Sequence, residues 1–188
     1  SWIYWSFVRF SFWPSPSIDQ LLEKHLSFLL KVHHSYGSLK RLSIDGRAKG
    51  SPTLDDYAYL IDALIEAYQT TLNEKWIETA KSLQVEQDRL FLDKESGGYR
   101  ISSQNQSVFG QLKVFQGNVR PAGQSVTVWN LIRLYQYFKD GAYKKSYERL
   151  MDSYPDSLQD HPAGYVFLLQ SVDYLLKSPK ELVIAGSK

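Results

Sequence analysis

The chain has 188 residues, of which 43% are hydrophobic and 22% charged, a composition typical of a globular domain with one core. Its 22 basic and 20 acidic residues give a formal charge of +2, without a long basic run that could grip phosphates, so nucleic acid is not an expected partner. No cysteine is present, which excludes disulfides, thiolate zinc sites and a CxxC redox centre.

The first sixteen residues differ from the rest because they crowd aromatic side chains around a single charge, Arg9. This run is too short and too interrupted for a membrane-spanning helix, which needs roughly 20 apolar residues. It also lacks the basic start and small-residue cleavage site of a secretory signal. We therefore treat 1–16 as a segment apart from the domain at 17–188, and we expect no membrane partner.

Apolar residues recur with a helical period in six stretches, and two of the links between stretches are short. Leu39 to Ile44, Tyr99 to Ile101 and Leu182 to Gly186 are predicted to be extended, and 102–123 is predicted to be a long irregular loop. The predicted helices are 17–35, 54–69, 73–91, 128–138, 143–154 and a last one that ends at 176, with either Asp160 or His161 as its cap.

A glycine-bracketed polar loop precedes the central helix. Gly46 and Gly50 flank Arg47 and Lys49, so we expect tight turns that hold the two cations outward. The helix can begin in two ways. Ser51 can cap it with Pro52 in its first turn, or Thr53 and Asp56 can form a capping box.

The two aspartates at this helix start are predicted to face different surroundings. On a helical wheel Asp55 lies with Asp62, Glu66 and Gln69 on the solvent side. Asp56 lies beside apolar positions, where a carboxylate is partly desolvated. Two readings of Asp56 stay open: an N-terminal cap favoured by the helix dipole, or a group that contacts a ligand.

The histidines in the sequence do not have the spacing of a metal site. His25 falls on the apolar face of the first predicted helix, which favours a hydrogen-bonded core residue. His33 and His34 are adjacent and cannot share a face. We therefore expect neither a metal nor a cofactor.

Helix pairs joined alternately by short and long loops are typical of an α/α toroid. The predicted fold class is all-α: a partial toroid built of antiparallel helix hairpins, with short extended segments in its loops. A simple helical bundle has similar apolar stripes, so the periodicity alone does not choose between the two.

Short motifs carry a family resemblance that spans Ile18 to Gly186. They are, in chain order, Asp45–Gly50, Asp55–Ala58, Gly97–Tyr99, Ser125–Val126 and Asn130–Leu134. In these motifs the chain resembles the thioredoxin-domain-containing, spermatogenesis-associated protein family and its microbial relatives. The resemblance implies a toroid similar to six-hairpin glycosidases and sugar epimerases, preceded in full members by a thioredoxin-like domain. It also implies that 17–188 is a portion of that toroid, truncated at both ends, whose partners are the remaining toroid and the thioredoxin-like domain.

One departure from the family bears on catalysis. Where relatives carry an Asp-Gly pair, this chain has Gly117-Asn118. Glycoside chemistry usually needs two carboxylates around the scissile bond. The loss of one acidic group therefore argues against activity in this chain, and the sequence leaves open whether it is an enzyme.

The leading hypothesis is a toroid mouth that binds or modifies a sugar-like ligand. Asp56 would act as the catalytic acid or base, and five residues would contact the ligand: Asp45, Arg47, Tyr57, Arg120 and Gln124. The alternative is a non-catalytic interaction module, or a degenerate fragment, that docks to a thioredoxin-like domain or another partner. The sequence does not indicate a cellular compartment.

Overall fold

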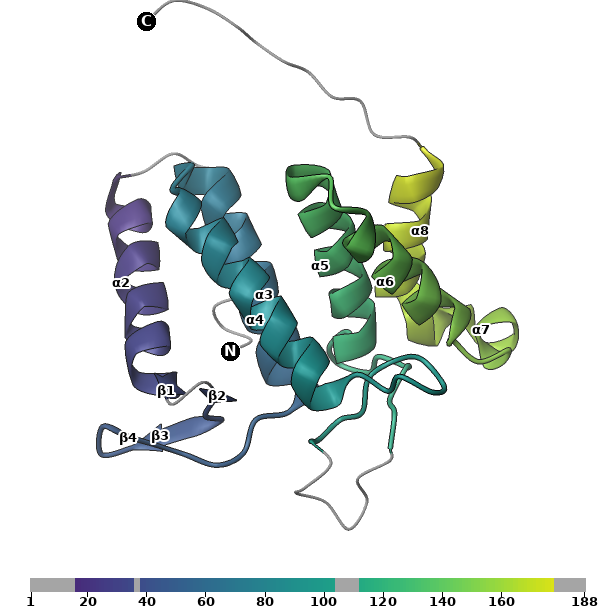
Figure 1. The fold of residues 1–188 in the computed structure, drawn as a ribbon, viewed down its shortest axis with the longest axis horizontal. Helices are drawn as coiled ribbons and strands as arrows, with labels where there is room; N and C mark the ends of the chain where they lie inside the picture. The colour runs from purple at the N-terminus through teal and green to yellow at the C-terminus, as the bar shows by residue number, and fades with distance from the viewer. Residues whose placement is uncertain (1–15, 36–37, 104–111, 178–188) are drawn as a thin grey trace, which may run out of the picture.

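The computed structural model describes residues 16–35, 38–103 and 112–177, and this part of the chain is mostly helical (Figure 1). The long helices are α2 (Pro16–His33), α3 (Leu54–Thr71), α4 (Glu74–Phe91), α5 (Gly123–Phe138), α6 (Gly141–Asp152) and α8 (Val166–Leu176). The short elements are α7 (Ser157–Asp160), the 3-10 helix η1 (Pro162–Tyr165), and strands β1 (His34–Ser35), β2 (Ser38–Leu39), β3 (Leu42–Ile44) and β4 (Arg47–Lys49). The all-α prediction is confirmed.

Two helix hairpins, α3–α4 and α5–α6, form the centre of the molecule. Each turns through a residue in the left-handed conformation, Leu72 at φ 55° and Lys139 at φ 53°. The next residue then caps the returning helix: Asn73 accepts a hydrogen bond from the Lys75 N–H, and Asp140 accepts one from the Ala142 N–H. Both short links are where the sequence predicts them.

Helices α3 and α5 meet along a line of polar pairs that we call the polar seam. The pairs are Asp55–Gly123, Ala58–Asn130, Asp62–Arg133, Glu66–Arg133 and Gln69–Tyr137. Residue numbers rise together on both helices, so α3 and α5 run in the same direction. The helical wheel predicted that the polar stripe of α3, which includes Asp62, faces solvent. That prediction is wrong: Asp62 is fully buried, because the polar stripe on α3 faces a polar stripe on α5.

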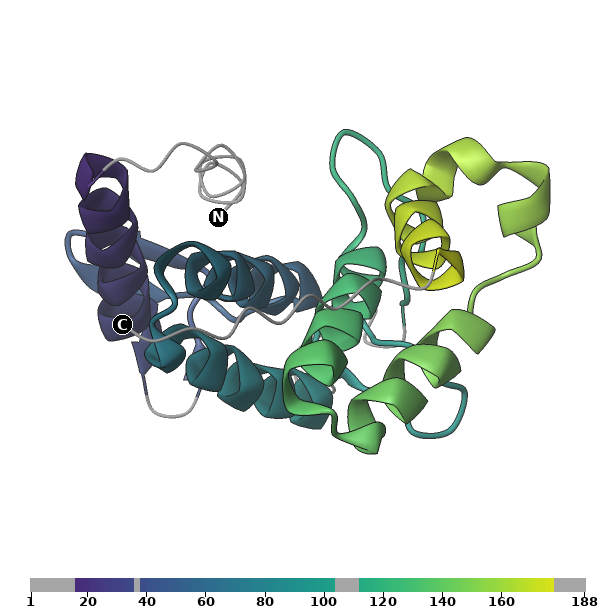
Figure 2. The same cartoon turned by 90° about the horizontal axis from the view of Figure 1, so that it is seen from above.

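The helices form two layers. The Gln136 side chain donates to the Tyr174 hydroxyl at 2.6 Å, and Trp129 packs edge-on against the same ring, so α8 lies on the far side of α5 from α3. Helix α4 packs behind α3 and α6 behind α5. Figure 2 shows these layers from above, with α3, α5 and α8 on one side and α4 and α6 on the other.

The apolar core lies between the layers. It is built mainly from α3 and α4, with α2, α5, α6 and α8 contributing. Its largest fully buried side chains include Tyr57, Tyr99 and Phe91. The Tyr57 ring packs edge-on against Phe91 at 5.6 Å between centroids. Burial of this kind of surface is the main stabilising contribution.

The last predicted helix is wrong in its extent. In place of one helix over 160–176 the chain forms α7, then η1, then α8. Pro162 lacks the N–H that a continuous helix requires, and Gly164 favours a turn, so the chain tightens into the 3-10 form before α8 begins.

The polar loop before the central helix is a β-hairpin. Strands β3 and β4 pair antiparallel with Leu42 opposite Lys49 and Ile44 opposite Arg47. Asp45 and Gly46 form the two-residue turn with φ of 52° and 74°, which a type I′ turn requires. Tyr99 makes only an isolated bridge to Leu92. The predicted strand at 182–186, and the aromatic segment except for Pro16, lie outside the described residues.

The short helix links lie at one end of the molecule and the long loops at the other, together with the β3–β4 hairpin (Figure 1). We call the second end the loop end. Across the described ranges, no helix combines the length and hydropathy that crossing a membrane requires.

Candidate functional site

Helix α3 begins at the loop end with a capping box. Thr53 is the N-cap, and Asp56 Oδ2 accepts hydrogen bonds from the Thr53 N–H at 2.8 Å and from its hydroxyl at 2.9 Å. The second of the two predicted helix starts is therefore confirmed. This arrangement fixes Asp56 in one orientation and satisfies donors that are otherwise unpaired at a helix start.

Asp56 also lines a cleft between the end of α2, the segment after β2, and α3. We call it the Asp56 cleft; it has a volume of about 110 Å³. It is lined by Leu29, His33, Leu39, Lys40, Arg41, Asp56, Tyr59, Leu60 and Ala63. An apolar floor thus meets two cations, a histidine and one carboxylate, and a few polar groups in an apolar surround are typical of ligand sites.

The neighbouring carboxylate, Asp55, turns toward α5. Its Oδ2 lies 2.9 Å from Arg120 Nη2, and its Oδ1 accepts the Gly123 N–H at 3.1 Å. Burial raises the pKa of Asp55, and the Arg120 charge and the Gly123 hydrogen bond oppose that rise. The structure therefore brings Arg120 to Asp55 and not to Asp56.

A second cleft, of about 240 Å³, lies beside Arg120; we call it the Arg120 cleft. It is lined by Gly117–Ala122 and Ser125, and by Ala163–Phe167 and Gln170. Gly117 and Asn118 both lie here. The Gly117 N–H donates to the Gly164 carbonyl at 2.8 Å, which ties the loop before α5 to the 3-10 turn before α8.

Tyr59 joins the two clefts. Tyr59 is a lining residue of the Asp56 cleft. Its hydroxyl donates to the Pro121 carbonyl in the wall of the Arg120 cleft, and the Arg120 guanidinium lies 6.0 Å from its ring centroid. One side chain therefore connects the start of α3 to the loop before α5.

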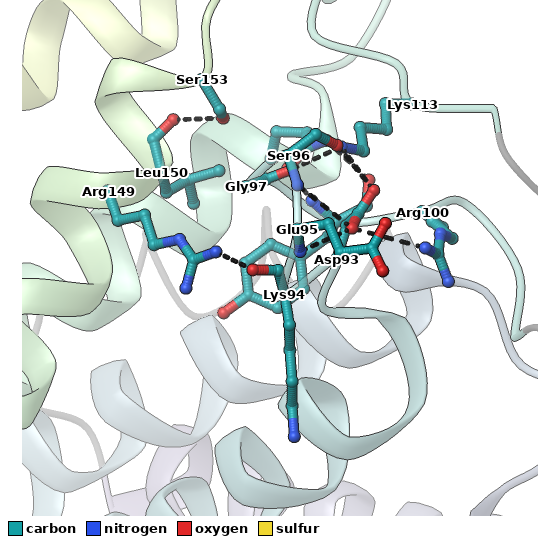
Figure 3. A network of polar contacts seen from close by, with 12 residues as sticks. Asp93, Lys94, Glu95, Ser96, Gly97, Arg100, Lys113, Arg149, Leu150 and Ser153 are labelled. Carbon is teal, nitrogen blue, oxygen red and sulfur yellow. Dashed lines mark hydrogen bonds and ion pairs between the residues drawn. The ribbon is translucent and has the colours of Figure 1, made fainter.

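A polar network around the buried Asp93 joins the turn after α4 to the loop before α5 (Figure 3). Asp93 accepts from Ser96 and lies between Lys113, at 2.9 Å, and Arg100, at 3.4 Å. The hydrogen bond from Lys113, followed by that from Ser96, lowers the pKa of Asp93 well below its usual range. Arg149 of α6 donates to the Lys94 carbonyl. The turn after α4 is therefore held by α6 as well as by Lys113.

Gln124 extends this support. Its side chain accepts the Tyr99 N–H at 2.9 Å and donates to the Tyr99 carbonyl at 2.7 Å, and it is fully buried. In this structure Gln124 holds the loop against α5 and lines neither cleft.

Three other predicted contact residues lie away from the two clefts. Tyr57 is fully buried: its hydroxyl donates to Glu86 and accepts the Leu39 N–H, and burial raises its pKa to about 12. Asp45 and Arg47 are exposed on the β3–β4 hairpin. Of the six predicted residues, Asp56 and Arg120 line clefts.

Sequence reasoning missed Tyr59, Lys40 and Arg41. The signal for Tyr59 was present, because it lies three residues after Asp56, so the two side chains share a helix face. Lys40 and Arg41 come from a different element and could not be placed by helical spacing. Within the described ranges no group of three or more His, Asp or Glu side chains is arranged to hold a metal ion.

Comparison with known proteins gives distant relatives. No protein-family model matches the chain. It is 27% identical over 138 residues to spermatogenesis-associated protein 20 of Homo sapiens, covering 72% of this chain and 17% of that protein. The Mus musculus protein of the same name is also 27% identical over 138 residues, covering 71% of this chain and 17% of that protein.

An uncharacterized protein of Caenorhabditis elegans is 30% identical over 132 residues, which cover 65% of this chain and 18% of that protein. The chain thus spans less than a fifth of the length of these curated relatives. The similarity to proteins with the spermatogenesis-associated name agrees with the family resemblance in the sequence.

Proposed function

We propose that this chain is part of an α/α toroid and binds a hydroxyl-rich, sugar-like ligand in the Asp56 cleft. The observation that carries the proposal is that Asp56 and Tyr59, one turn apart on α3, line the same cleft at the loop end. Carboxylates accept hydroxyl hydrogen bonds, and aromatic walls suit the apolar faces of sugar rings.

The layering of the helices supports the toroid. Helices α3, α5 and α8 lie side by side, α3 and α5 run in the same direction, and each short link leads into a helix packed behind. Repeated hairpins of this kind form an inner layer and an outer layer. Such a repeat gathers all the long loops at one end, where a shared ligand site can form.

The size of the cleft limits the ligand. At about 110 Å³ it is smaller than a typical drug-sized pocket of roughly 300–1,000 Å³. We therefore expect it to take a single terminal sugar residue, with the remainder of a longer glycan outside.

Binding fits the arrangement better than hydrolysis. Asp56 is the carboxylate in the cleft wall, and Asp55 is held on the other side by Arg120 and Gly123. Glycoside hydrolysis usually requires two carboxylates on opposite sides of one bond. We propose Asp56 as a hydroxyl acceptor, with Asp55 and Arg120 keeping the loop before α5 against α3.

The test is calorimetric titration of the full chain with a panel of monosaccharides and short glycans. We expect Asp56→Asn to weaken binding at least about tenfold, because it removes a charge-assisted hydrogen bond, which contributes about 1.5–3 kcal/mol. Thr53→Ala is the matched control: it weakens the same cap but keeps the carboxylate, so its affinity should stay within about threefold of the parent. No binding by any sugar, or equal binding by Asp56→Asn, contradicts the proposal.

A second candidate function is docking of another protein domain at the Arg120 cleft. Val119 and Val166, in its lining, are 86% and 65% exposed, and clustered exposed apolar residues are typical of interaction surfaces. Val119→Ser together with Val166→Ser should abolish association with the thioredoxin-like domain of a full-length relative and leave sugar binding intact. Unchanged association would reject this function.

A further inference from the structure

We infer that the ligand of the Asp56 cleft carries a negative charge, as a sugar acid or a sugar phosphate does. The inference rests on the proposed function and names the class of ligand for the same site. It comes from the balance of charges around the cleft. Lys40 and Arg41 both line it, and Asp56 is the acidic residue in its lining.

The carboxylate at this site already has partners. Asp56 Oδ2 accepts two hydrogen bonds from Thr53 at the start of α3, where the helix dipole also favours negative charge. The preceding residue, Asp55, forms an ion pair with Arg120 and accepts a hydrogen bond from the Gly123 N–H. Neither aspartate is within ion-pair distance of Lys40 or Arg41.

Neither cation forms an ion pair in the described ranges, although the Arg41 charge acts more weakly on Asp55, where it opposes the rise in the pKa of that carboxyl. Over the ranges that the structure describes, no acidic side chain lies within 4 Å of the Lys40 ammonium or the Arg41 guanidinium. The hairpin that follows the cleft residues carries Arg47 and Lys49 against one acidic residue, Asp45. The segment from Lys40 to Lys49 is therefore net positive, and a net positive charge attracts anions.

The geometry favours an anionic group joined to an apolar ring. A guanidinium can bind a carboxylate or phosphate through two parallel hydrogen bonds. The floor formed by Leu29, Leu60 and Ala63 excludes water from one side of the cleft, which strengthens such pairs. His33 lines the cleft as well, and its Nδ1 lies 2.9 Å from the Lys40 carbonyl, which fixes the ring and leaves Nε2 for a ligand hydroxyl.

The experiment compares glucose, glucuronate, glucose 6-phosphate and inorganic phosphate as ligands of the full chain by calorimetry at low salt. We expect one or both anionic sugars to bind at least tenfold more tightly than glucose, and this advantage to shrink in 0.5 M NaCl. Arg41→Gln and Lys40→Gln should each remove most of the advantage, so that they weaken binding of the anionic sugars more than binding of glucose. Lys145→Gln, on the exposed face of α6, is the matched control and should behave like the parent.

The outcomes separate the two proposals. If glucose binds as tightly as the anionic sugars, this inference is wrong and the proposed function stands. If none of the sugars binds, both fail. If inorganic phosphate binds as tightly as glucose 6-phosphate, the cleft is a simple anion site, which also contradicts the inference. Preference for glucuronate over glucose 6-phosphate, or the reverse, decides between the two anionic groups.

Discussion

Gly123 is the residue on which contact between α3 and the loop before α5 most depends. A Cβ at this position would lie 2.5 Å from Asp55 Oδ1 and 3.1 Å from Leu54 Cγ, so no larger side chain fits without movement. The absence of a side chain lets the Gly123 N–H reach Asp55, and Asp55 in turn reaches Arg120.

Gly123→Ala should therefore destabilise the protein by about 1–3 kcal/mol, the usual cost of overpacking, although glycine to alanine in a helix normally stabilises. Gly141→Ala is the matched control: nothing lies within 4 Å of a Cβ built there, so it should be neutral or stabilising by up to about 1 kcal/mol. Urea unfolding measures both. An equal effect of the two substitutions would show that Gly123 is not tightly packed.

Asp93 gives a prediction about pH. Its pKa is lowered in the folded state, first by the hydrogen bond from Lys113. Its stabilising contribution is therefore complete above the unfolded-state pKa of 3.8 and is lost as the pH falls below it toward the folded-state pKa. Asp93→Asn should cost about 3 kcal/mol at pH 7, as expected when one partner of a buried ion pair is removed.

The measurement is the difference in unfolding free energy between the parent and Asp93→Asn at a series of pH values. This difference should be constant from pH 7 to pH 5 and should shrink below pH 4. Asp140→Asn, which keeps an N-cap acceptor at an exposed position, should show little difference at any pH. A difference for Asp93→Asn that does not change with pH would contradict the ion-pair account.

At this scale the sequence predicted part of the site. The capping role of Asp56 follows from a local spacing of three residues, and the structure confirms it. The pairing of Asp55 with Arg120 joins residues 65 positions apart (120 minus 55), and no local pattern encodes it. The β3–β4 hairpin was not predicted, although Asp45-Gly46 is a dipeptide typical of a type I′ turn.

Helices pair in this protein through polar as well as apolar stripes. The seam between α3 and α5 contains Arg133, which is 3% exposed and donates to Asp62 and Glu66. Arg133 also approaches Asn130, whose amide donates to the Ala58 carbonyl at 2.8 Å. Groups buried in this way are costly to leave unpaired. The polar seam therefore fixes the axial and rotational alignment of α3 and α5.

Arg133→Met should destabilise the protein by about 3–5 kcal/mol, because it leaves the Asp62 charge buried without its guanidinium. Adding Asp62→Leu to that variant should recover more than about 1 kcal/mol, as expected for coupled residues in contact. Thermal and urea unfolding of the parent, both single variants and the double variant give the coupling energy. Additive effects would show that the pair does not interact.

This seam explains why helix positions were easier to predict than helix faces. Asn73 and Asp140 carry capping signals in the sequence, so the two hairpins were found. A helical wheel assigns a polar stripe to solvent, and it cannot know that another polar stripe faces it. The 3-10 form of η1 was missed because proline is also common in the first turn of an α-helix, so Pro162 was read as the start of one long helix.

The two ends of the molecule differ: one carries the short helix links and the other is the loop end. The short links at Leu72-Asn73 and Lys139-Asp140 lie at one end, and the hairpin, the long loop and both clefts lie at the other. The Asp93 network and Gln124 hold the long loop onto α4, α5 and α6. The loop end is therefore a supported surface, which favours a preformed ligand site.

The most direct test of ligand binding at the Asp56 cleft is hydrogen–deuterium exchange of the full chain with and without the tightest-binding sugar of the panel. The account predicts slower exchange on ligand binding in residues 29–33, 39–41 and 56–63, which contain the lining of the cleft, and unchanged exchange in α6. Protection confined to other segments, or no change in 29–33, 39–41 and 56–63 at a saturating ligand concentration, would contradict it.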